Sequence, residues 1–429
     1  MSDTPQRAYP DGRVVQPLYT EGPALQAGFR RQPWWTMVQE HAADKEFAAN
    51  HWALARLSHG ASGLLFYLYD HHYLPRILKD IDLRYIHLHL VVEGNGAEVM
   101  EALLHHAHNE VVSLDQVHGC LNIDPLEAAA RTGSFDESKM YELGELSRLA
   151  PPNMRYMCVN ATLYGNSGAS AATQLALATA HLDFYLDAFG SVGLDRYWIG
   201  LTSSSYLFQE MAKVRAVRLL WARLLETYDL PATAIEVYCE TPVTDQTAYD
   251  VHSNLLRATS AAFGAVVGGA DQVQIKPYDA LVETPSEEGE RLALNQHFLL
   301  AYESYLDRTE DPAAGSYFVE TLTQELCEDA WAYFQEIKAQ GGLLAALEKG
   351  TVQDRIASEV ERAEPEKVLG VNLFPQAGQR LPEQFIARPA RGRDEHKALF
   401  QGASFEPLRP IRWAAAAEYE RAQAEFNQK

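Results

Sequence analysis

The stretch MCVNATLYGNSGASAATQLALATA, residues 157–180, passes from an apolar run through a small polar turn into a helix-forming segment. This order is typical of a β/α unit, in which a buried strand presents its carboxyl end before the chain returns as a helix. The turn, residues 162–170, contains no histidine, lysine, arginine, aspartate or glutamate. The stretch therefore predicts the place of an active site but equips it with no carboxylate, imidazole, amine or guanidinium side chain.

The same alternation continues on both sides of this stretch. Seven short apolar runs separated by helical patterns predict parallel strands at residues 62–69, 84–92, 117–124, 155–161, 196–202, 234–240 and 271–277. A shorter eighth strand is expected around residues 304–311. We therefore predict an α/β fold, an eight-stranded parallel (β/α) TIM barrel over residues 43–350. An open doubly wound sheet is the alternative, but no G-x-G-x-x-G follows the first predicted strand.

Two segments fall outside the predicted barrel. Residues 1–42 contain five prolines and little periodicity, which indicates an extended N-terminal arm. Residues 351–429 begin with one helix and continue as an irregular, proline-rich C-terminal extension with spaced apolar residues. Such a segment often wraps another surface, and a disordered linker is the alternative interpretation.

The composition excludes several classes of partner. A formal charge of −22 argues against nucleic acid and anionic membranes, because their phosphates would be repelled. No apolar run approaches the roughly 18 residues that span a bilayer, and the first residues lack the apolar core of a secretory signal. The four cysteines are scattered and form no paired spacing, so we expect a cytoplasmic protein with reduced thiols.

The predicted strand ends carry few chemical groups. The titratable residues there are of mixed type and include no obvious carboxylate pair: Asp70, His71, His72, Glu93, Asp124, Glu240, Lys276 and Asp279. His87 and His89 form an H-x-H pattern, which in a strand places both imidazoles on one side, as in zinc-dependent barrel hydrolases. Three strand residues follow them, which sets the pair ~10 Å below the rim at ~3.3 Å per residue. We favour a core or helix-facing pair and keep the zinc hydrolase as an alternative.

Six stretches resemble the methylmalonyl-CoA mutase family, specifically its small subunit. They are DGRVVQPLYT (11–20), PWWTMVQEHA (33–42), GCLNIDPLEAAARTGS (119–134), YLFQEMAKVRAVRLLWARL (206–224), NLLRATSAAFGAVVGGAD (254–271) and DPAAGSYFVETLT (311–323). The resemblance covers residues 11 to about 375. It implies a barrel that threads an acyl-CoA along its axis and an isomerisation of methylmalonyl-CoA to succinyl-CoA.

The resemblance also implies adenosylcobalamin as the cofactor of the complex. In the family a separate carboxyl-terminal domain holds it through a D-x-H-x-x-G histidine, a motif that this sequence does not contain. We therefore expect no cobalamin-binding domain here, and a large catalytic partner subunit that binds the cobalamin and the acyl-CoA substrate in a heterodimer. The alternative is the barrel of another acyl-CoA mutase that takes cobalamin from a separate protein.

The chain departs from the family's catalytic pattern. The tyrosine-histidine pair that in catalytic chains faces the thioester corresponds to Thr162 and Leu163. The remaining candidates for a degenerate site are Asn166, Arg196, Asp271 and Gln274. Losing the groups aimed at the thioester removes transition-state stabilisation. We therefore expect the chain by itself to be structural and inactive, with no catalytic residue and no metal site.

A barrel that lacks the catalytic groups would be retained because it contacts the partner subunit. Two segments carry the apolar residues that such a contact needs. They are residues 11–35, with Val14, Val15, Leu18, Tyr19, Phe29, Trp34 and Trp35, and residues 368–413, with Leu369, Val371, Leu373, Phe374, Phe400, Phe405, Leu408 and Trp413. The alternative is that both segments fold back over their own barrel.

Overall fold

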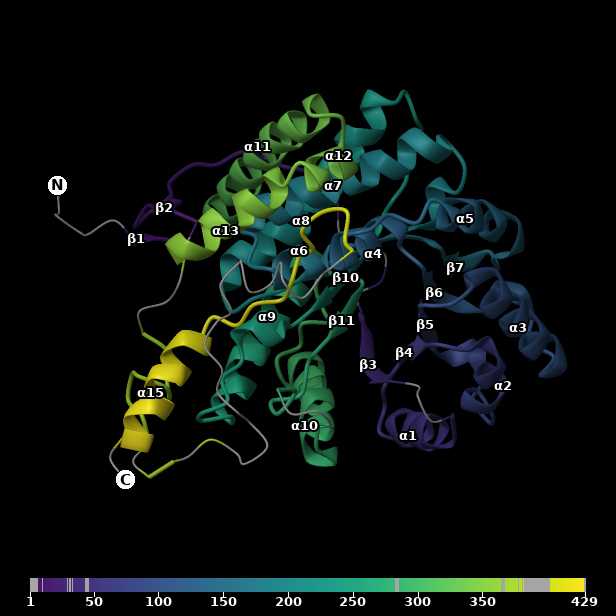
Figure 1. The fold of residues 1–429 in the computed structure, drawn as a ribbon, viewed down its shortest axis with the longest axis horizontal. Coiled ribbons are helices and arrows are strands. Elements are labelled where there is room, and N and C mark those ends of the chain that lie inside the picture. The colour runs from purple at the N-terminus through teal and green to yellow at the C-terminus, as the bar shows by residue number, and fades with distance from the viewer. Residues whose placement is uncertain are drawn as a thin grey trace.

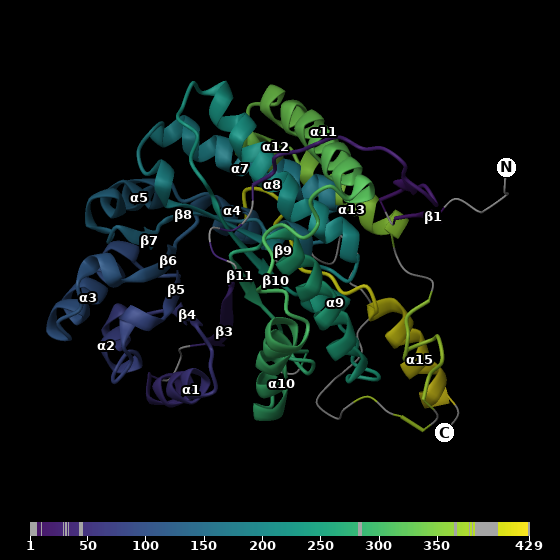
Figure 2. The ribbon, with the colours of Figure 1, turned by 180° about the vertical axis from the view of Figure 1, so that it is seen from behind.

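A parallel sheet closed into a barrel forms the centre of the molecule, with helices around its outside (Figures 1 and 2). The computed structural model describes residues 7–9, 11–28, 30, 32, 34–42, 46–281, 285–363, 367–376, 378, 379, 381 and 402–427. The barrel strands are β3 (Thr36–Ala42), β4 (Gly63–Leu68), β5 (His87–Val92), β6 (His118–Asn122), β7 (Asn153–Arg155), β8 (Met157–Asn160), β9 (Tyr197–Thr202), β10 (Glu236–Glu240) and β11 (Gln272–Gln274).

The sheet order is β7-β6-β5-β4-β3-β11-β10-β9-β8, and the pairing is parallel throughout. Its two end strands, β7 and β8, follow one another in the chain with Tyr156 between them. They are two halves of one strand, so the sheet is an eight-stranded barrel in which β11 pairs with β3. The predicted fold class is confirmed.

The break between β7 and β8 is a β-bulge. Cys120 and Cys158 both face the barrel interior, and Arg155 pairs with Cys120 on the same side. Tyr156 and Met157 both pack into the outer core, although neighbouring strand residues normally face opposite sides. One extra residue therefore resets the alternation, as a bulge does.

The position predicted for the eighth strand is wrong. Residues 304–311 form no strand, because Tyr305 and Asp311 adopt positive φ angles of 54° and 42° that end extended structure. The missing strand is β3, which lies in the segment assigned to the arm, so the barrel begins at Thr36. Glu40 interrupts the apolar pattern of β3, and a buried partner, Lys276, compensates its charge.

The helices that cover the barrel include α1 (Glu46–Ser58), α2 (Leu74–Ile77), α3 (Gly96–Asn109), α4 (Pro125–Thr132), α5 (Ser138–Leu149), α6 (Thr162–Asn166), α7 (Ala171–Phe189), α8 (Leu207–Thr227), α9 (Ser253–Gly268) and α10 (Glu287–Phe298). The 3-10 turns are η1 (His71–Tyr73), η2 (Leu83–Tyr85), η3 (Leu114–Gln116), η4 (Leu194–Arg196) and η5 (Val243–Asp245), and η6 (Leu299–Glu303) is a π-turn. Helix α7 is buried along most of its length because α11 (Tyr317–Ala339) packs over it and α8.

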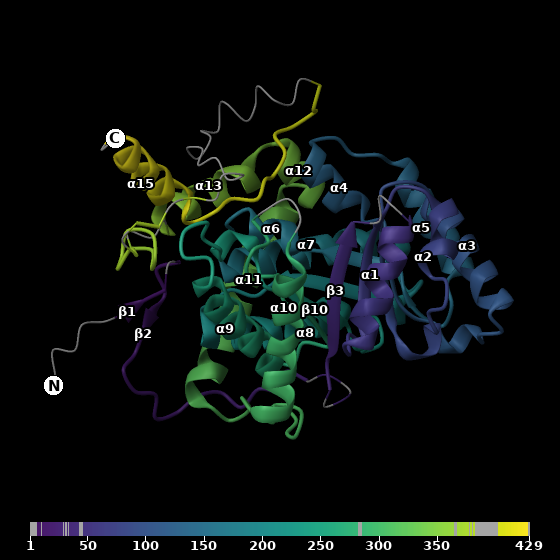
Figure 3. The same cartoon turned by 90° about the horizontal axis from the view of Figure 1, so that it is seen from below.

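The C-terminal part folds back over the carboxyl ends of the barrel strands. After α12 (Leu343–Glu348) and α13 (Thr351–Ala363), the structure describes residues 367–376, 378, 379 and 381, and then residues 402–427 (Figure 3). The backbone N–H of Leu408 donates to the carbonyl of Ala130 (2.7 Å), and that of Ile411 to Asn166 (2.8 Å). The helix predicted at the start of this region is confirmed by α13, whereas α15 (Ala415–Asn427) lies where an irregular segment was expected.

The N-terminal arm forms a small hairpin, in which β1 (Arg7–Ala8) pairs antiparallel with β2 (Val14–Val15). It lies near the end of α13 (Figure 1). Arg13 anchors it to α11 through Glu325 (3.0 Å) and Asp329 (2.6 Å). The arm therefore contacts its own barrel layer through charged as well as apolar residues.

Candidate functional site

A cavity of about 860 Å³ occupies the upper half of the barrel and opens at the carboxyl ends of its strands. Its floor includes His89, Cys120, Trp198 and Tyr238. The tail residues 410–412 lie at its mouth. Because barrel enzymes place their chemistry at this end, the cavity is the candidate site.

A buried ion pair stands at the upper wall of the cavity. The Nζ atom of Lys276 lies 2.7 Å from Oε1 of Glu40 and 3.6 Å from Oε2 of Glu240. Burial favours the neutral amine, but the two carboxylates outweigh it and raise the pKa of Lys276. The pKa of Glu40 is lowered, since Lys276 outweighs the effect of burial. Lys276 is thus held as a cation and is unsuited to act as a base or nucleophile at neutral pH.

Two tyrosines complete this polar layer. Tyr67 donates to Oε2 of Glu40 (3.2 Å), and the charge of Glu40 together with burial raises its pKa. Tyr238 donates to Oε1 of Gln274. Both phenols therefore stay protonated and act as hydrogen-bond donors.

The quiet turn lies beside this layer. Residues 162–166 form the short helix α6, and Thr162, Leu163 and Asn166 all line the cavity. Thr162 donates to Oδ1 of Asn160 (2.7 Å), while Asn166 donates to Oε1 of Glu240 (2.8 Å). Leu163 packs into the outer core. This part of the wall offers hydrogen bonds to neighbours but no titratable group.

Beneath α6, Asp124 holds a buried hydrogen-bond network. Its carboxylate contacts Nε2 of His181 (2.8 Å), the hydroxyl of Tyr185 (2.6 Å) and the backbone N–H of Asn160 (2.7 Å). Burial alone would raise the pKa of Asp124, but His181 and these donors lower it. Asp124 thereby ties β8 to α7 and is committed to structure.

Glu127 is a carboxyl group of the cavity wall whose pKa is raised. It stands in the first turn of α4, 3.3 Å from Arg131. Burial outweighs the attraction of Arg131 and raises the pKa of Glu127 to about 7. Its proton is therefore exchangeable near neutral pH.

The H-x-H pair faces the barrel interior, so the helix-facing interpretation is wrong. Nδ1 of His89 lies 3.1 Å from Sγ of Cys120, and the ring of His87 lies 5.6 Å from that of His118. Burial lowers the pKa of His87 to about 3. Strand β5 turns its leucines outward because they complete the outer core.

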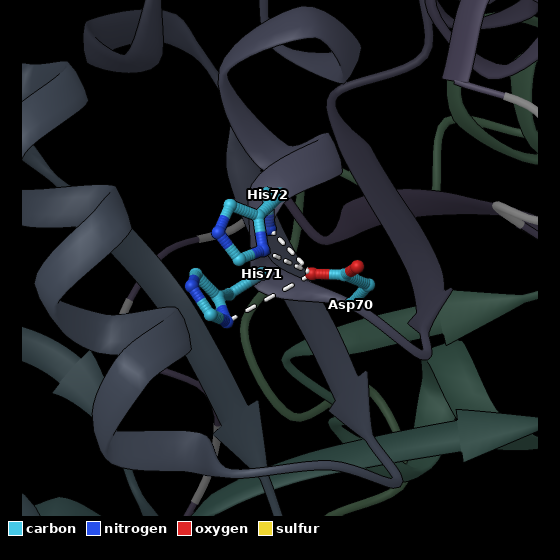
Figure 4. Close-up of side chains that lie close together, drawn as sticks. All are labelled: Asp70, His71 and His72. Carbon is cyan, nitrogen blue, oxygen red and sulfur yellow. Dashed lines mark hydrogen bonds and ion pairs between the residues drawn. The ribbon is translucent and has the colours of Figure 1, made fainter.

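Within the described ranges, one cluster of three possible metal ligands is present: Asp70, His71 and His72 (Figure 4). Nδ1 of His72 lies 2.7 Å from Oδ1 of Asp70, and Nδ1 of His71 lies 3.1 Å from Oε2 of Glu98. The backbone N–H and the side chain of His72 lower the pKa of Asp70. Asp70 caps η1, and the side chain of His72 is 75% exposed, so the group is explained as a helix cap at the surface.

Two predicted site residues require correction. Arg196 donates to the carbonyl of Pro151 (2.8 Å), and Asp271 accepts from Arg218 (2.7 Å) and the N–H of Val237 (2.8 Å). Each residue precedes its strand and therefore lies at the amino end of the barrel, opposite the cavity mouth. Gln274 faces the interior beside Tyr238, and Thr162, Leu163 and Asn166 line the cavity.

Sequence reasoning missed Glu40, Tyr67 and Tyr238. Tyr67 and Tyr238 alternate with apolar residues in β4 and β10 and point inward, so period-two alternation was the available signal for them. Glu40 is flanked by polar residues in β3, and no such alternation marks it. The Cys120–His89 contact joins residues 31 positions apart, and no sequence pattern marks it.

Comparison with known proteins agrees with the resemblance. The sequence profile of the family described as methylmalonyl-CoA mutase matches residues 67–388. A methylmalonyl-CoA mutase small subunit from Streptomyces virginiae is 33% identical over 87% of this chain and 66% of its own length. Those from Porphyromonas gingivalis and Propionibacterium freudenreichii subsp. shermanii are 29% and 30% identical, over 85% and 74% of this chain and 63% and 53% of their own lengths.

The chain thus spans two thirds or less of the length of these curated relatives. In the part of the chain that the structure describes, no helix has the length and apolar character needed to cross a bilayer.

Proposed function

The chain belongs to the methylmalonyl-CoA mutase family, and from this premise we propose that it is the non-catalytic small subunit of a heteromeric, adenosylcobalamin-dependent methylmalonyl-CoA mutase. A large partner subunit carries the substrate acyl-CoA, the cobalamin and turnover. The barrel supplies scaffold and contact surface, in the cytoplasm, where its free thiols stay reduced.

One observation carries this proposal. Thr162 and Leu163 stand at the cavity wall where the resemblance places the family's tyrosine-histidine pair. Thr162 is engaged with Asn160, and Leu163 is 5% exposed in an apolar core. Neither residue can donate a strong hydrogen bond to a thioester carbonyl, so the stabilisation that the isomerisation requires is missing from this wall.

The described residues do not fit cobalamin. Cobalt coordination by the protein needs an imidazole that can reach the corrin, and His89 is the one histidine among the described residues lining the cavity. It lies at the floor and is bonded to Cys120. The proposal accordingly leaves the cofactor with the partner subunit.

Neither alternative gains support from a specific contact. A zinc hydrolase needs at least three protein ligands, whereas no third ligand joins His87 and His89 within the described ranges. Another acyl-CoA mutase would need an imidazole or equivalent donor at α6. Zinc analysis of the purified protein tests the hydrolase alternative, because one zinc per chain would contradict the small-subunit proposal.

The test of the proposal is co-purification. The tagged chain isolated from its native host should bring down a second mutase chain, identified by mass spectrometry. Alone, with adenosylcobalamin and methylmalonyl-CoA, it should form no succinyl-CoA, whereas the reconstituted pair should. Turnover by the isolated chain would overturn the proposal.

The proposed partner surface uses the apolar residues that the structure leaves exposed. Leu18 is 75% and Phe374 82% exposed. Trp35, Phe405 and Leu408 are buried in the chain's own core, so their assignment to a partner contact is corrected. Phe29 and Phe400 lie outside the described residues.

Two variants test this surface. Leu18→Glu and, separately, Phe374→Glu should weaken association with the large subunit, while Tyr85→Glu, at an equally exposed position (78%), should not. Undiminished affinity in the first two, with the fold intact by circular dichroism, would place the contact elsewhere.

A further inference from the structure

The floor of the barrel cavity contains a thiol and an imidazole in direct contact. Sγ of Cys120 lies 3.1 Å from Nδ1 of His89, and both residues line the cavity. Cys120 is 2% and His89 1% exposed to solvent. A reagent can therefore reach this pair only through the cavity.

The second nitrogen of His89 has no partner within the described part of the chain. Nε2 is fully buried and makes no hydrogen bond. When Nδ1 is engaged with Cys120 as an acceptor of its S–H, or as the donor of an imidazolium to a thiolate, Nε2 carries a hydrogen. A buried, unpaired N–H on a cavity-lining side chain is costly unless a ligand oxygen accepts from it.

The charges around the pair favour thiolate and imidazolium. Burial by itself would raise the pKa of Cys120, but the neighbouring Cys158 thiol and the charge of His89 lower it to about 6. For His89, burial disfavours the cation, and the Cys120 sulfur outweighs this effect, which raises its pKa. Glu236, in the polar layer below, contributes in the same direction for His89 and in the opposite direction for Cys120.

The walls around the pair suit a short acyl group. The ring of His89 lies 6.4 Å from that of Trp198 and 6.1 Å from that of Tyr238. Leu65 and Val91 also line the cavity. The space of about 860 Å³ lies within the range of ordinary small-molecule sites.

We propose that Cys120 and His89 form a nucleophilic pair that accepts the acyl group of a thioester entering the barrel cavity. The choice of a thioester rests on the proposed function, whose complex acts on an acyl-CoA. Accordingly, this cavity is a covalent acyl site although its α6 wall lacks the groups needed for isomerisation.

The step is balanced without any further reactant. The Cys120 sulfur attacks the thioester carbonyl carbon while His89 stays hydrogen-bonded to this sulfur through Nδ1 and holds the proton of the pair. The carbon–sulfur bond to the leaving thiol breaks, and that thiolate takes up the proton lost by the pair. One thioester is exchanged for another, so the reaction is reversible, and an excess of the donor thioester drives it towards the acyl-enzyme.

The experiment uses the full chain and a small thioester, S-propionyl-N-acetylcysteamine. Intact-mass and peptide mass spectrometry should find one propionyl group per chain, on Cys120, released by hydroxylamine. Cys120→Ser should lose the adduct. His89→Gln should form it about 10- to 100-fold more slowly, because a cysteine with an ordinary pKa is only a few per cent thiolate at neutral pH.

Cys239→Ser is the matched control. Cys239 faces the outer core, where burial raises its pKa to about 12, so its removal should leave the adduct unchanged. Should His89→Gln fail to fold, iodoacetamide labelling of the wild-type Cys120 replaces it, with a pH midpoint near 6 expected and one above 8 contradicting the pair.

Absence of a propionyl adduct on the folded wild-type chain, or equal labelling of Cys239, overturns the proposal. Association with the large subunit is measured on the same preparation. Failed acylation with intact association therefore counts against the acyl site alone, and failed association against the proposed function.

Discussion

Asp124 illustrates how a single buried carboxylate stabilises the upper half of the barrel. His181 and Tyr185 from α7 and the backbone of β8 donate to it, and its pKa is lowered. Stability from such a group is present above the carboxyl's unfolded pKa and is lost as the pH falls through its lower folded value.

We expect Asp124→Asn to lower the free energy of unfolding by about 3 kcal/mol, because it leaves a buried network without its charge. Asp136→Asn is the control, since the exposed Asp136 contacts the neighbouring Ser138 and its replacement should change the free energy of unfolding far less. Urea denaturation of both variants at pH 7 measures the difference. Equal losses would show that the network is not specific to Asp124.

The raised pKa of Glu127 predicts that the free energy of unfolding depends on pH in the direction opposite to that expected from Asp124. Its pKa is raised to about 7, so between its unfolded value and pH 7 the folded state holds a proton that the unfolded state has released. The unfolding free energy therefore falls as the pH rises through this window.

Glu127→Gln should remove this loss and stabilise the protein at pH 8 relative to wild type, by up to about 3 kcal/mol at about 1.4 kcal/mol per pKa unit. At pH 5 the variant should match wild type. Glu145→Gln, at an exposed position of α5, should change neither value. Thermal unfolding across pH 5–8 measures this, and a pH-independent difference would contradict it.

Among the elements, the β5–β6 pair depends on a glycine. Gly119 in β6 has a φ of +143°, and a Cβ there would lie 1.9 Å from the carbonyl oxygen of Leu88 in β5. No side chain can fit against a backbone atom at that distance without separating the two strands.

We expect Gly119→Ala to destabilise the fold by more than about 3 kcal/mol or to prevent soluble expression, since severe effects of this size follow from backbone strain. Gly144→Ala in α5, where a Cβ meets nothing within 4 Å, should instead be neutral or stabilise by up to about 1 kcal/mol. Denaturant midpoints of the two variants distinguish strand-specific strain from general intolerance of alanine.

Across the whole molecule, the C-terminal segment closes the barrel that the first strands open. Leu408, 5% exposed, packs into the main core and bonds through its backbone to Ala130. The segment is therefore part of the folding unit, although it lies far from the barrel strands in the sequence.

Leu408→Ala should cost about 2–4 kcal/mol and unfold together with the barrel in one transition. Phe374→Ala, at a side chain 82% exposed, should stay within about 0.5 kcal/mol of wild type. Circular dichroism and tryptophan fluorescence should give the same midpoint. A separate early transition in the Leu408 variant would show that the tail folds independently.

The sequence by itself determined the class of fold and most of its strands. Buried parallel strands carry continuous apolar runs, and seven of the eight predicted positions coincide with strands of the barrel. These are β4 to β11, with β7 and β8 counted as the two halves of one strand. The family resemblance and the absence of histidine, lysine, arginine, aspartate and glutamate at residues 162–170 were likewise readable from local patterns, because they depend on the order of residues alone.

Only the tertiary structure decided the eighth strand, the composition of the cavity and the place of the tail. Glu40 made β3 look unlike a buried strand until Lys276, 236 residues away, supplied its counter-charge. Arg196 and Asp271, which the resemblance suggested as site candidates, precede their strands and so lie at the end of the barrel opposite the cavity mouth, a placement that the sequence does not show. The contact between His89 and Cys120 arises from the pairing of β5 with β6, whose register places the two inward side chains beside one another.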